Sequence, residues 1–579
     1  MICETSRWAA ALCRVRSAAA LVTLAAASLT CLGGCPKSKP AAVPTTSTST
    51  PTATEVDEQC ALIIANVHDT FHLHHLELTT TLADSVARLN DWQRACGGES
   101  SGESDLPADI AGMLSSEQAE YLRIPQFTLR DGVHLQDGVM IRAITAALAA
   151  GQAPGSTDLD RVRQIFRYVA LGIELTPDLP SELALSAYEV CQLGKGTAAD
   201  RAWVFASLLK QQRIDAVILS PGGKSADGSD VAPYLLVGVP VENQVYLFDP
   251  RLGVPIPAPP GSSGPAVATL EQAASDPAIL RQLDVPEQPY PVTATDLERP
   301  SVAIATESGF WPERMRSLQG QFSGDQAMVI SDPLQDSGEV PGLVSRVVSA
   351  GGSRWSRESV TLWDYPERQL HRHMALSEPQ QKARAILFMP FFAYLTIAPD
   401  PKTGQLTFAA QEELADPSAT KFDPGVVMRK RTTVRAQLRA RLHQLAGDSR
   451  QAVMDYHDVW QHSKRVLELG PPADVRIMHA RAMDDSMYWT ALCKFNQGEY
   501  QVAIDSCLNY RRKYSLGAWR RQVRYLLALS HAATGNAEAA IKELSEADSK
   551  DPEYPAYQLL IRQWKSAPEG DHSKSTSSR

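Results

Sequence analysis

The sequence has little of what a nucleic-acid-binding protein or a membrane-spanning protein needs. Its 579 residues carry 56 Lys and Arg against 66 Asp and Glu, so the formal net charge is -10 and the basic surplus typical of a nucleic-acid-binding domain is missing. Beyond the N-terminal segment there is no apolar run of about eighteen residues, the length that predicts a spanning helix. Hydrophobic residues make up 44% of the chain, which suits globular cores in about three domains. We therefore expect proteins or small molecules, and no nucleic acid, as partners.

Residues 1–34 have the three parts of an export signal. A start with three arginines precedes an apolar segment over residues 18–32, and two glycines stand before a cysteine. Leu32-Gly33-Gly34-Cys35 resembles the lipobox of bacterial lipoproteins. The resemblance implies cleavage before Cys35, acylation of that residue, and a location in the cell envelope, lipid-anchored on the exported side of a bacterial membrane. A plain secretory signal and a transmembrane anchor are the alternatives.

A tether and a helical segment follow this signal. Residues 35–56, rich in Pro, Ser and Thr, contain too few apolar residues to repay ordering, which predicts a disordered spacer. In residues 57–115 apolar side chains recur at helical spacing. In an exported, oxidising setting Cys60 and Cys96 are able to join the ends of a helical hairpin, although the sequence alone does not fix the pairing.

Three histidines of this segment are weak candidates for a metal site. His68, His72 and His75 fall on one helical face, and neutral imidazoles at that spacing can share a metal ion. The alternative is an ordinary solvated helix face.

The rest of the chain predicts an α+β part followed by a helical part. Helices and β-branched runs between residues 116 and 260 indicate an α+β domain. Residues 261–372 begin as a Pro-rich linker and then suggest a small α/β unit, with strands near Ser301 and Ala327. Residues 373–565 are mostly helical by pattern, and residues 566–579 predict a disordered tail.

The helical part contains repeats. Gly498-Glu499-Tyr500 precedes Ala503, and Gly535-Asn536-Ala537 precedes Ala540 at the same spacing. This template resembles the tetratricopeptide repeat, and a segment that begins at Gly447 looks like a degenerate third copy. The resemblance implies stacked helical hairpins whose small residues sit at close helix crossings, and a protein partner bound by the repeats.

The α+β part carries the pattern that bears most on function. A glycine-rich turn over residues 194–197 opens a helix over residues 198–209, and a strand begins near Ala216. This layout resembles the transglutaminase-like fold, which is papain-like at its centre. In that family the helix begins with a nucleophilic Cys, a later strand supplies a His, and an Asp follows before a Pro.

Two of the three corresponding positions lack the required chemistry. The alignment puts Ala198 at the position of the Cys and Tyr234 at that of the His, whereas Asp249, followed by a proline, matches the Asp. No histidine occurs between His134 and His371, so no shift of register supplies one. These residues predict a degenerate site, that is, a pseudoenzyme.

Other residues near the turn do not restore that site. Cys191 precedes the turn and lacks a histidine partner, so we expect an ordinary thiol pKa and no nucleophilic role. Thr197 fits the N-cap of the helix. A basic cluster between Arg429 and Arg441 indicates an amphipathic helix with a charged exterior, or a surface for anionic partners.

We therefore predict a non-catalytic, membrane-anchored lipoprotein without a cofactor. The membrane is bound through acylated Cys35, and an unknown protein is bound by the degenerate transglutaminase-like domain and the repeats acting as a scaffold. One alternative is a transglutaminase-like cysteine hydrolase or amide-transfer enzyme with a different register of catalytic residues. Another is a metal-binding lipoprotein that uses the histidine face.

Overall fold

The structure is a computed structural model that describes most of the chain after residue 52. The described residues are 53–71, 82–96, 107–176, 183–221, 234–259, 261, 266–286, 288–392, 396–399, 406–409 and 436–566. The predicted signal, the lipobox with Cys35, most of the tether and the tail after residue 566 lie outside them, as do His72 and His75. None of the helices in the described ranges is both long and apolar enough to cross a membrane.

A disulfide-linked helical hairpin begins the described part. Helix α2 spans Ala53–Phe71 and therefore starts a few residues inside the predicted tether, and α3 spans Leu82–Cys96. Cys60 and Cys96 form a disulfide with their Cα atoms 5.8 Å apart, so the pairing that the sequence left open is present. Three helices follow: α4 (Ala108–Ala111), α5 (Ser116–Arg123) and α6 (Leu129–Ala150).

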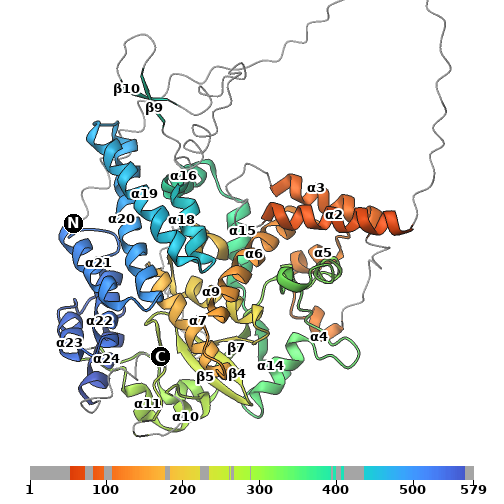
Figure 1. The fold of residues 1–579 in the computed structure, drawn as a ribbon. Coiled ribbons are helices and arrows are strands. Elements are labelled where there is room, and N and C mark those ends of the chain that lie inside the picture. The colour runs from red at the N-terminus through yellow and green to blue at the C-terminus, as the bar shows by residue number, and fades with distance from the viewer. Residues whose placement is uncertain are drawn as a thin grey trace, which may run out of the picture. The chain divides into compact units, whose positions relative to one another are not determined.

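A mixed six-stranded sheet, in the order β6-β5-β4-β3-β7-β8, forms the centre of the fold (Figure 1). Its strands are β3 (Val217–Ser220), β4 (Leu236–Val241), β5 (Gln244–Asp249), β6 (Val254–Pro255), β7 (Ser301–Ile304) and β8 (Val360–Leu362). Every neighbouring pair is antiparallel except β7 with β8. Glu242 and Asn243, both with positive φ, make the tight β4–β5 turn.

Side-chain alternation gives the sheet two apolar faces. Val237, Val239 and Phe248 join a cluster with α7 (Asp158–Gly172) and α9 (Ala198–Gln211). Their neighbours in sequence, such as Leu236 and Leu247, join a second cluster with α10 (Leu270–Ser275) and α12 (Ala294–Glu298). Both faces are therefore buried, which explains why these strands are apolar at nearly every position.

The region 261–372 does not form the separate unit that its sequence suggested. The strand near Ser301 is β7, which pairs with β3 through Val217 and Ile304 and so extends the central sheet. The segment at Ala327 is not a strand, because its backbone bonds to side chains instead: the amide group of Gln211 bonds to both the N–H and the carbonyl of Val329. Both segments are bonded to partners that are distant in the sequence, and the local sequence does not indicate such partners.

Shorter elements complete the core. Its other helices are α8 (Ala187–Leu193), α11 (Pro277–Arg281), α13 (Glu313–Gln319), α14 (Leu343–Gly351), α15 (Tyr365–Met374) and α16 (Glu378–Phe392). Three single turns of 3-10 helix lie at Ser308–Phe310, Gly324–Gln326 and Arg357–Ser359. A parallel pair joins β1 (Glu174–Leu175) to β2 (Lys195–Gly196), and a hairpin joins β9 (Thr396–Pro399) to β10 (Leu406–Ala409).

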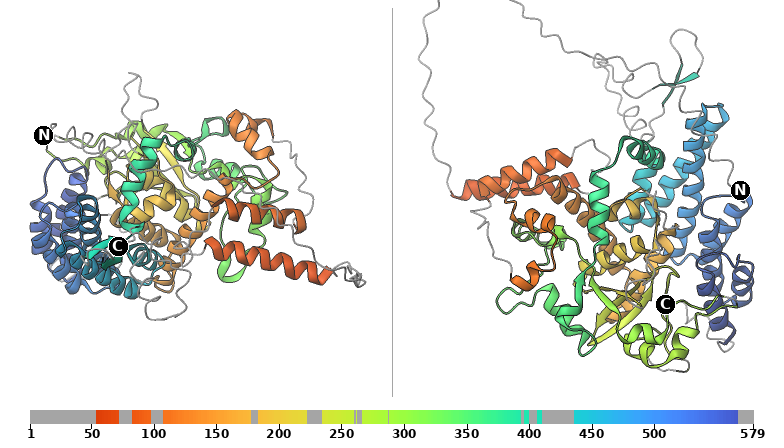
Figure 2. Two further views of the ribbon diagram at one scale, coloured as in Figure 1. Left: turned by 90° about the horizontal axis from the view of Figure 1, so that it is seen from above. Right: turned by 180° about the vertical axis from the view of Figure 1, so that it is seen from behind.

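The C-terminal part is a series of antiparallel helices, drawn in light to dark blue in Figures 1 and 2. They are α18 (Ala436–Leu445), α19 (Ser449–Glu468), α20 (Ala473–Asn496), α21 (Tyr500–Lys513), α22 (Arg520–Ala533), α23 (Ala537–Ser545) and α24 (Tyr554–Ser566). Gly447, Gly498 and Gly535 occupy three of the turns with φ of 85°, 76° and 80°, a conformation that glycine adopts without strain. Ala503 and Ala540 are fully buried. The protein is thus a mixed α/β fold with a large helical share.

Candidate functional site

The start of α9 is occupied by a closed hydrogen-bond network. Thr197 is the N-cap: the Asp200 backbone N–H donates to its hydroxyl (3.1 Å), and the Thr197 N–H donates to the Asp200 carboxylate (2.8 Å). The Tyr365 hydroxyl donates to the same carboxylate (2.9 Å) and lies 3.1 Å from the Thr197 hydroxyl. Ala198 is buried at the first helical position. The position that the sequence alignment assigns to a nucleophile therefore holds a methyl group beside a capped helix end.

Asp249 is a structural residue. Its buried carboxylate accepts hydrogen bonds from the hydroxyls of Tyr234 (2.5 Å) and Tyr290 (2.7 Å), and from the backbone N–H groups of Arg251 (2.8 Å) and Leu252 (2.9 Å). Burial raises the pKa of Asp249, and these four donors oppose that rise. The carboxylate thus binds two tyrosines and the turn after β5, and it fixes the end of that strand. None of its four donors is a histidine.

Tyr234 and Asp249 also lie on the wrong face of the sheet to meet Ala198. Tyr234 packs with the cluster that includes Leu236, Leu247, α10 and α12, whereas α9 packs on the opposite face. Asp249 follows Leu247 by two positions in β5, so both side chains leave the strand on the same side. The degenerate site predicted from the sequence, in which Tyr234 and Asp249 would face Ala198, is therefore not assembled. Side chains alternate along a strand, so Asp249 lies on the same face of β5 as Leu247 and on the opposite face from Phe248. The sequence therefore contained this signal.

Cys191 is a buried thiol within α8, and its pKa departs from the ordinary value expected from the sequence. Its side chain is buried, and desolvation raises its pKa to about 12. Its backbone carbonyl accepts a hydrogen bond from Arg441 (2.6 Å), which also donates to the carbonyl of Gln192 (3.2 Å) and stacks on the ring of Trp489 at 4.5 Å. Arg441 is therefore buried and is not part of a charged exterior. The first residues of the basic cluster lie outside the described residues.

The remaining metal candidate is buried too. His68 is 9% exposed, and its ring lies 5.7 Å from that of Phe322. In the described part of the chain, no three or more His, Cys, Asp or Glu side chains are grouped so that they could hold a metal ion.

The helical series is joined to the core by buried polar contacts. Arg201 of α9 is fully buried and pairs with Glu553, at the start of α24, at 2.8 Å. The same guanidinium donates to the carbonyl of Ile173 after α7 (2.6 and 2.9 Å) and to that of Pro250 after β5 (3.1 Å). The Tyr488 hydroxyl of α20 donates to another carbonyl of α7 (2.8 Å). These contacts hold one side of the helical series against the core.

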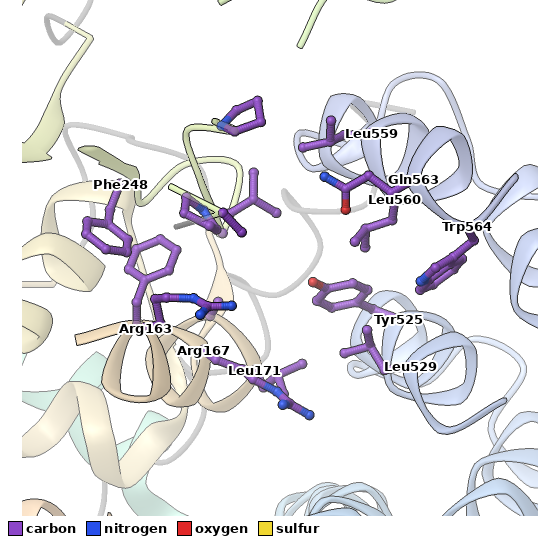
Figure 3. Close-up of a pocket in the computed structure, with 17 residues that line it drawn as sticks. Arg163, Arg167, Leu171, Phe248, Tyr525, Leu529, Leu559, Leu560, Gln563 and Trp564 are labelled. Carbon is purple, nitrogen blue, oxygen red and sulfur yellow. The ribbon is translucent and has the colours of Figure 1, made fainter. Parts of the chain in front are cut away.

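An apolar cavity of about 150 Å³ opens where α7 and the β5–β6 turn meet α22 and α24 (Figure 3). Its walls include Phe166, Phe248, Leu529, Leu559 and Trp564. Among the lining residues that the structure describes there is no Cys, His, Ser, Asp, Glu or Lys, and burial raises the pKa of the Tyr525 hydroxyl to about 12. Its chemistry is suited to binding. The sequence did not reveal it, because its walls come from segments almost four hundred residues apart.

The cavity also has polar lining residues. Arg163 projects from α7 toward Tyr525 of α22, the guanidinium of Arg167 points away from that of Arg163, and Gln563 lies across the cavity on α24 (Figure 3). The guanidinium of Arg167 lies over the ring of Phe495 at 5.1 Å, and burial lowers its pKa from the usual arginine value.

In comparisons with known proteins, no family model, no curated protein and no solved structure matches this chain.

Proposed function

We propose that this chain is a non-catalytic binding protein, anchored in a bacterial cell envelope by acylation of Cys35. Its core is a degenerate relative of the transglutaminase-like fold, and its C-terminal helices are tetratricopeptide-like hairpins. The core and the hairpins act together as a scaffold that binds partners.

The observation that carries this proposal is that the three positions aligned with catalytic residues have structural surroundings and do not come together. Ala198 stands beside a capped helix end, and Asp249 is bound by two tyrosines and two backbone N–H groups. Burial also raises the pKa of Cys191 and of Cys493 to about 12, which leaves almost no thiolate at neutral pH. Among the free cysteines that the structure describes, Cys191, Cys493 and Cys507, none has a lowered pKa that would support the alternative of a cysteine enzyme with a shifted register.

The arrangement of the helices favours binding by the joined core and hairpins over binding by the hairpins alone. Arg201 with Glu553, and Arg441 with two carbonyls of α8, fix part of the helical series to the core. The cavity between α7 and α24 is built from both parts. A scaffold with this rigidity needs little reorganisation when it binds.

A turnover assay tests the non-catalytic claim. The purified full-length protein is incubated with a fluorescent amine and a glutamine-containing acceptor protein, and separately with amide and ester substrates. We expect no incorporation and no hydrolysis above the buffer rate. Turnover that disappears in Cys191→Ala, but persists in the matched variant Cys507→Ala, would overturn the proposal in favour of a cysteine enzyme.

The anchor is tested separately. Intact-mass measurement of the protein extracted from membranes should show a chain that starts at Cys35 and carries acyl groups, and Cys35→Ser should leave the membrane fraction. A chain that starts elsewhere, or one without acyl mass, would contradict the lipid anchor and leave the binding role to be judged by the turnover assay.

A further inference from the structure

We infer that the cavity between α7 and α24 binds a small neutral aromatic molecule whose one hydrogen-bond acceptor is bound by the Tyr525 hydroxyl. This inference rests on the proposed binding function and assigns a ligand class to it. It follows from the volume of the cavity, from its aromatic walls, and from the interactions that its polar side chains already make.

The volume of the cavity limits the size of the ligand. A volume of about 150 Å³ is that of a cavity able to hold one benzene-sized group. Sites for drug-sized molecules are several times larger. The ligand is therefore a single ring with a short substituent, whereas a long acyl chain would extend into water.

The walls favour an aromatic ring. Four of the seventeen lining residues are aromatic, and each comes from a different element: Phe166 of α7, Phe248 of β5, Tyr525 of α22 and Trp564 of α24. Phe166 and Phe248 pack against each other with ring centroids 5.0 Å apart. Aromatic rings attract one another in offset or edge-to-face contact, beyond the gain from burial alone. A flat ring between these side chains would therefore be preferred to an aliphatic group of the same volume.

The charged side chains of the cavity do not select an ion. Arg163 lies 3.4 Å from the carboxylate of Asp160. The guanidinium of Arg167 lies over the ring of Phe495 and points away from that of Arg163 (Figure 3). No acidic residue is among the lining residues that the structure describes, so a cation has no counter-charge there. Because burial of an unpaired charge is costly, a neutral ligand is favoured over either kind of ion.

The Tyr525 hydroxyl is available to a ligand. It points from α22 into the space between α7 and α24 (Figure 3), and it has no hydrogen-bond partner among the described residues. Gln563, across the cavity, already has a partner within the chain. Burial raises the pKa of Tyr525 to about 12, so at neutral pH the hydroxyl keeps its proton and can donate it. An acceptor atom on the ligand would satisfy this donor, which otherwise lies without a partner beside apolar walls.

Isothermal titration calorimetry of the full-length protein tests the inference. The probes are acetophenone, which has one carbonyl acceptor, and benzoate, which has nearly the same shape and a negative charge. We expect the Kd of acetophenone to be at least about tenfold lower than that of benzoate, because the carboxylate would lose its water without gaining a free cation. Equal or tighter binding of benzoate, or no binding of acetophenone, would overturn the inference.

The variant Tyr525→Phe tests the hydrogen bond. Loss of one neutral hydrogen bond should raise the Kd of acetophenone by about two- to tenfold. Ethylbenzene has almost the same outline but no acceptor, so it should bind the variant at least as tightly as the wild type. An unchanged Kd of acetophenone, or an equal loss for both ligands, would show that the hydroxyl does not bind the ligand and would overturn the inference.

A cavity-filling variant locates the site. Leu560→Trp puts a larger side chain on the cavity wall at α24 and should raise the Kd of acetophenone at least about tenfold. Leu508→Trp is the matched control, because Leu508 of α21 is also half-buried but does not line the cavity, and it should leave the Kd unchanged. Thermal melting shows whether each variant is folded, and Tyr525→Phe, which keeps the ring, decides the question if Leu560→Trp does not fold. An equal loss in Leu560→Trp and Leu508→Trp would contradict the site.

Two further outcomes separate this inference from the function on which it rests. A peptide with a phenylalanine side chain that binds more than about tenfold more tightly than acetophenone would identify a partner protein as the occupant, which overturns the inference alone. Conversion of acetophenone to a product during the titration would overturn the proposed non-catalytic function.

Discussion

The buried ion pair between Arg201 and Glu553 gives the sharpest prediction about how the fold holds together. Glu553→Gln keeps the shape and one acceptor oxygen but removes the negative charge. Arg201 is fully buried, and the Glu553 side chain is only 5% exposed, so water cannot replace the lost charge. The guanidinium keeps its three backbone carbonyl acceptors, of Ile173, Pro250 and Ala170, and they solvate part of it.

Breaking a buried pair by removing one partner costs about 3–5 kcal/mol, and the retained carbonyl contacts place this variant near the lower end. We therefore expect Glu553→Gln to lower the free energy of unfolding by about 3 kcal/mol. The assay is urea unfolding followed by tryptophan fluorescence. The matched control is Glu499→Gln, which removes a partly exposed pair with Lys494 in the same helical series. It should cost less than about 1 kcal/mol.

A double-mutant cycle with Arg201→Met isolates the pair. The double variant should be about 2 kcal/mol more stable than the sum of the two single losses predicts. Once Arg201 is replaced by methionine, Glu553→Gln no longer leaves an unpaired cation in the core. Strict additivity, or a loss from Glu553→Gln no larger than that from the control, would refute the conclusion that this ion pair joins the helical series to the core.

Three further perturbations test separate parts of the fold. Replacing Cys60 and Cys96 by serine removes a cross-link over 36 residues and should lower the unfolding free energy of the α2–α3 hairpin by about 3–4 kcal/mol in non-reducing buffer, with no difference from wild type once both are reduced. Ala540→Phe overpacks a fully buried helix crossing and should cost about 1–3 kcal/mol; an unchanged melting curve would contradict the close crossing. Burial raises the pKa of Asp137 to about 7 from an ordinary value of 3.8, so the folded state binds a proton that the unfolded state has lost. The free energy of unfolding should therefore fall as pH rises from about 4 to 7, and Asp137→Asn should flatten that slope. An unaltered slope in the variant would count against the raised pKa.

Local signals predicted local structure. Thr197 is the expected N-cap, to which the structure adds a capping box with Asp200, and glycines at 447, 498 and 535 occupy the expected turns. Each of these depends on residues only a few positions apart, so the sequence contains the whole interaction. The helical patterns and the β-branched runs likewise predicted a mixed core of helices and strands.

The outcomes that the sequence did not predict depend on distant segments. β7 pairs with β3 across about eighty residues, and the sequence of neither strand indicates which strand it pairs with. Arg201 and Arg441 look like surface charges, yet both are buried because carbonyls at the ends of other helices and strands accept their hydrogen bonds. The cavity was missed for the same reason, since Phe166 and Trp564 meet only in the folded chain.

The labelling rate of Cys191 in the folded, full-length protein is the most direct test of the central claim that the site has no catalytic chemistry. Iodoacetamide is added at pH 8 and the modified cysteines are identified by peptide mass. Because burial excludes the reagent and holds the thiol pKa near 12, labelling in the native state should be far slower than in urea. Native labelling faster than that of the unfolded chain, accompanied by loss of any measured turnover, would show an activated nucleophile and contradict the account.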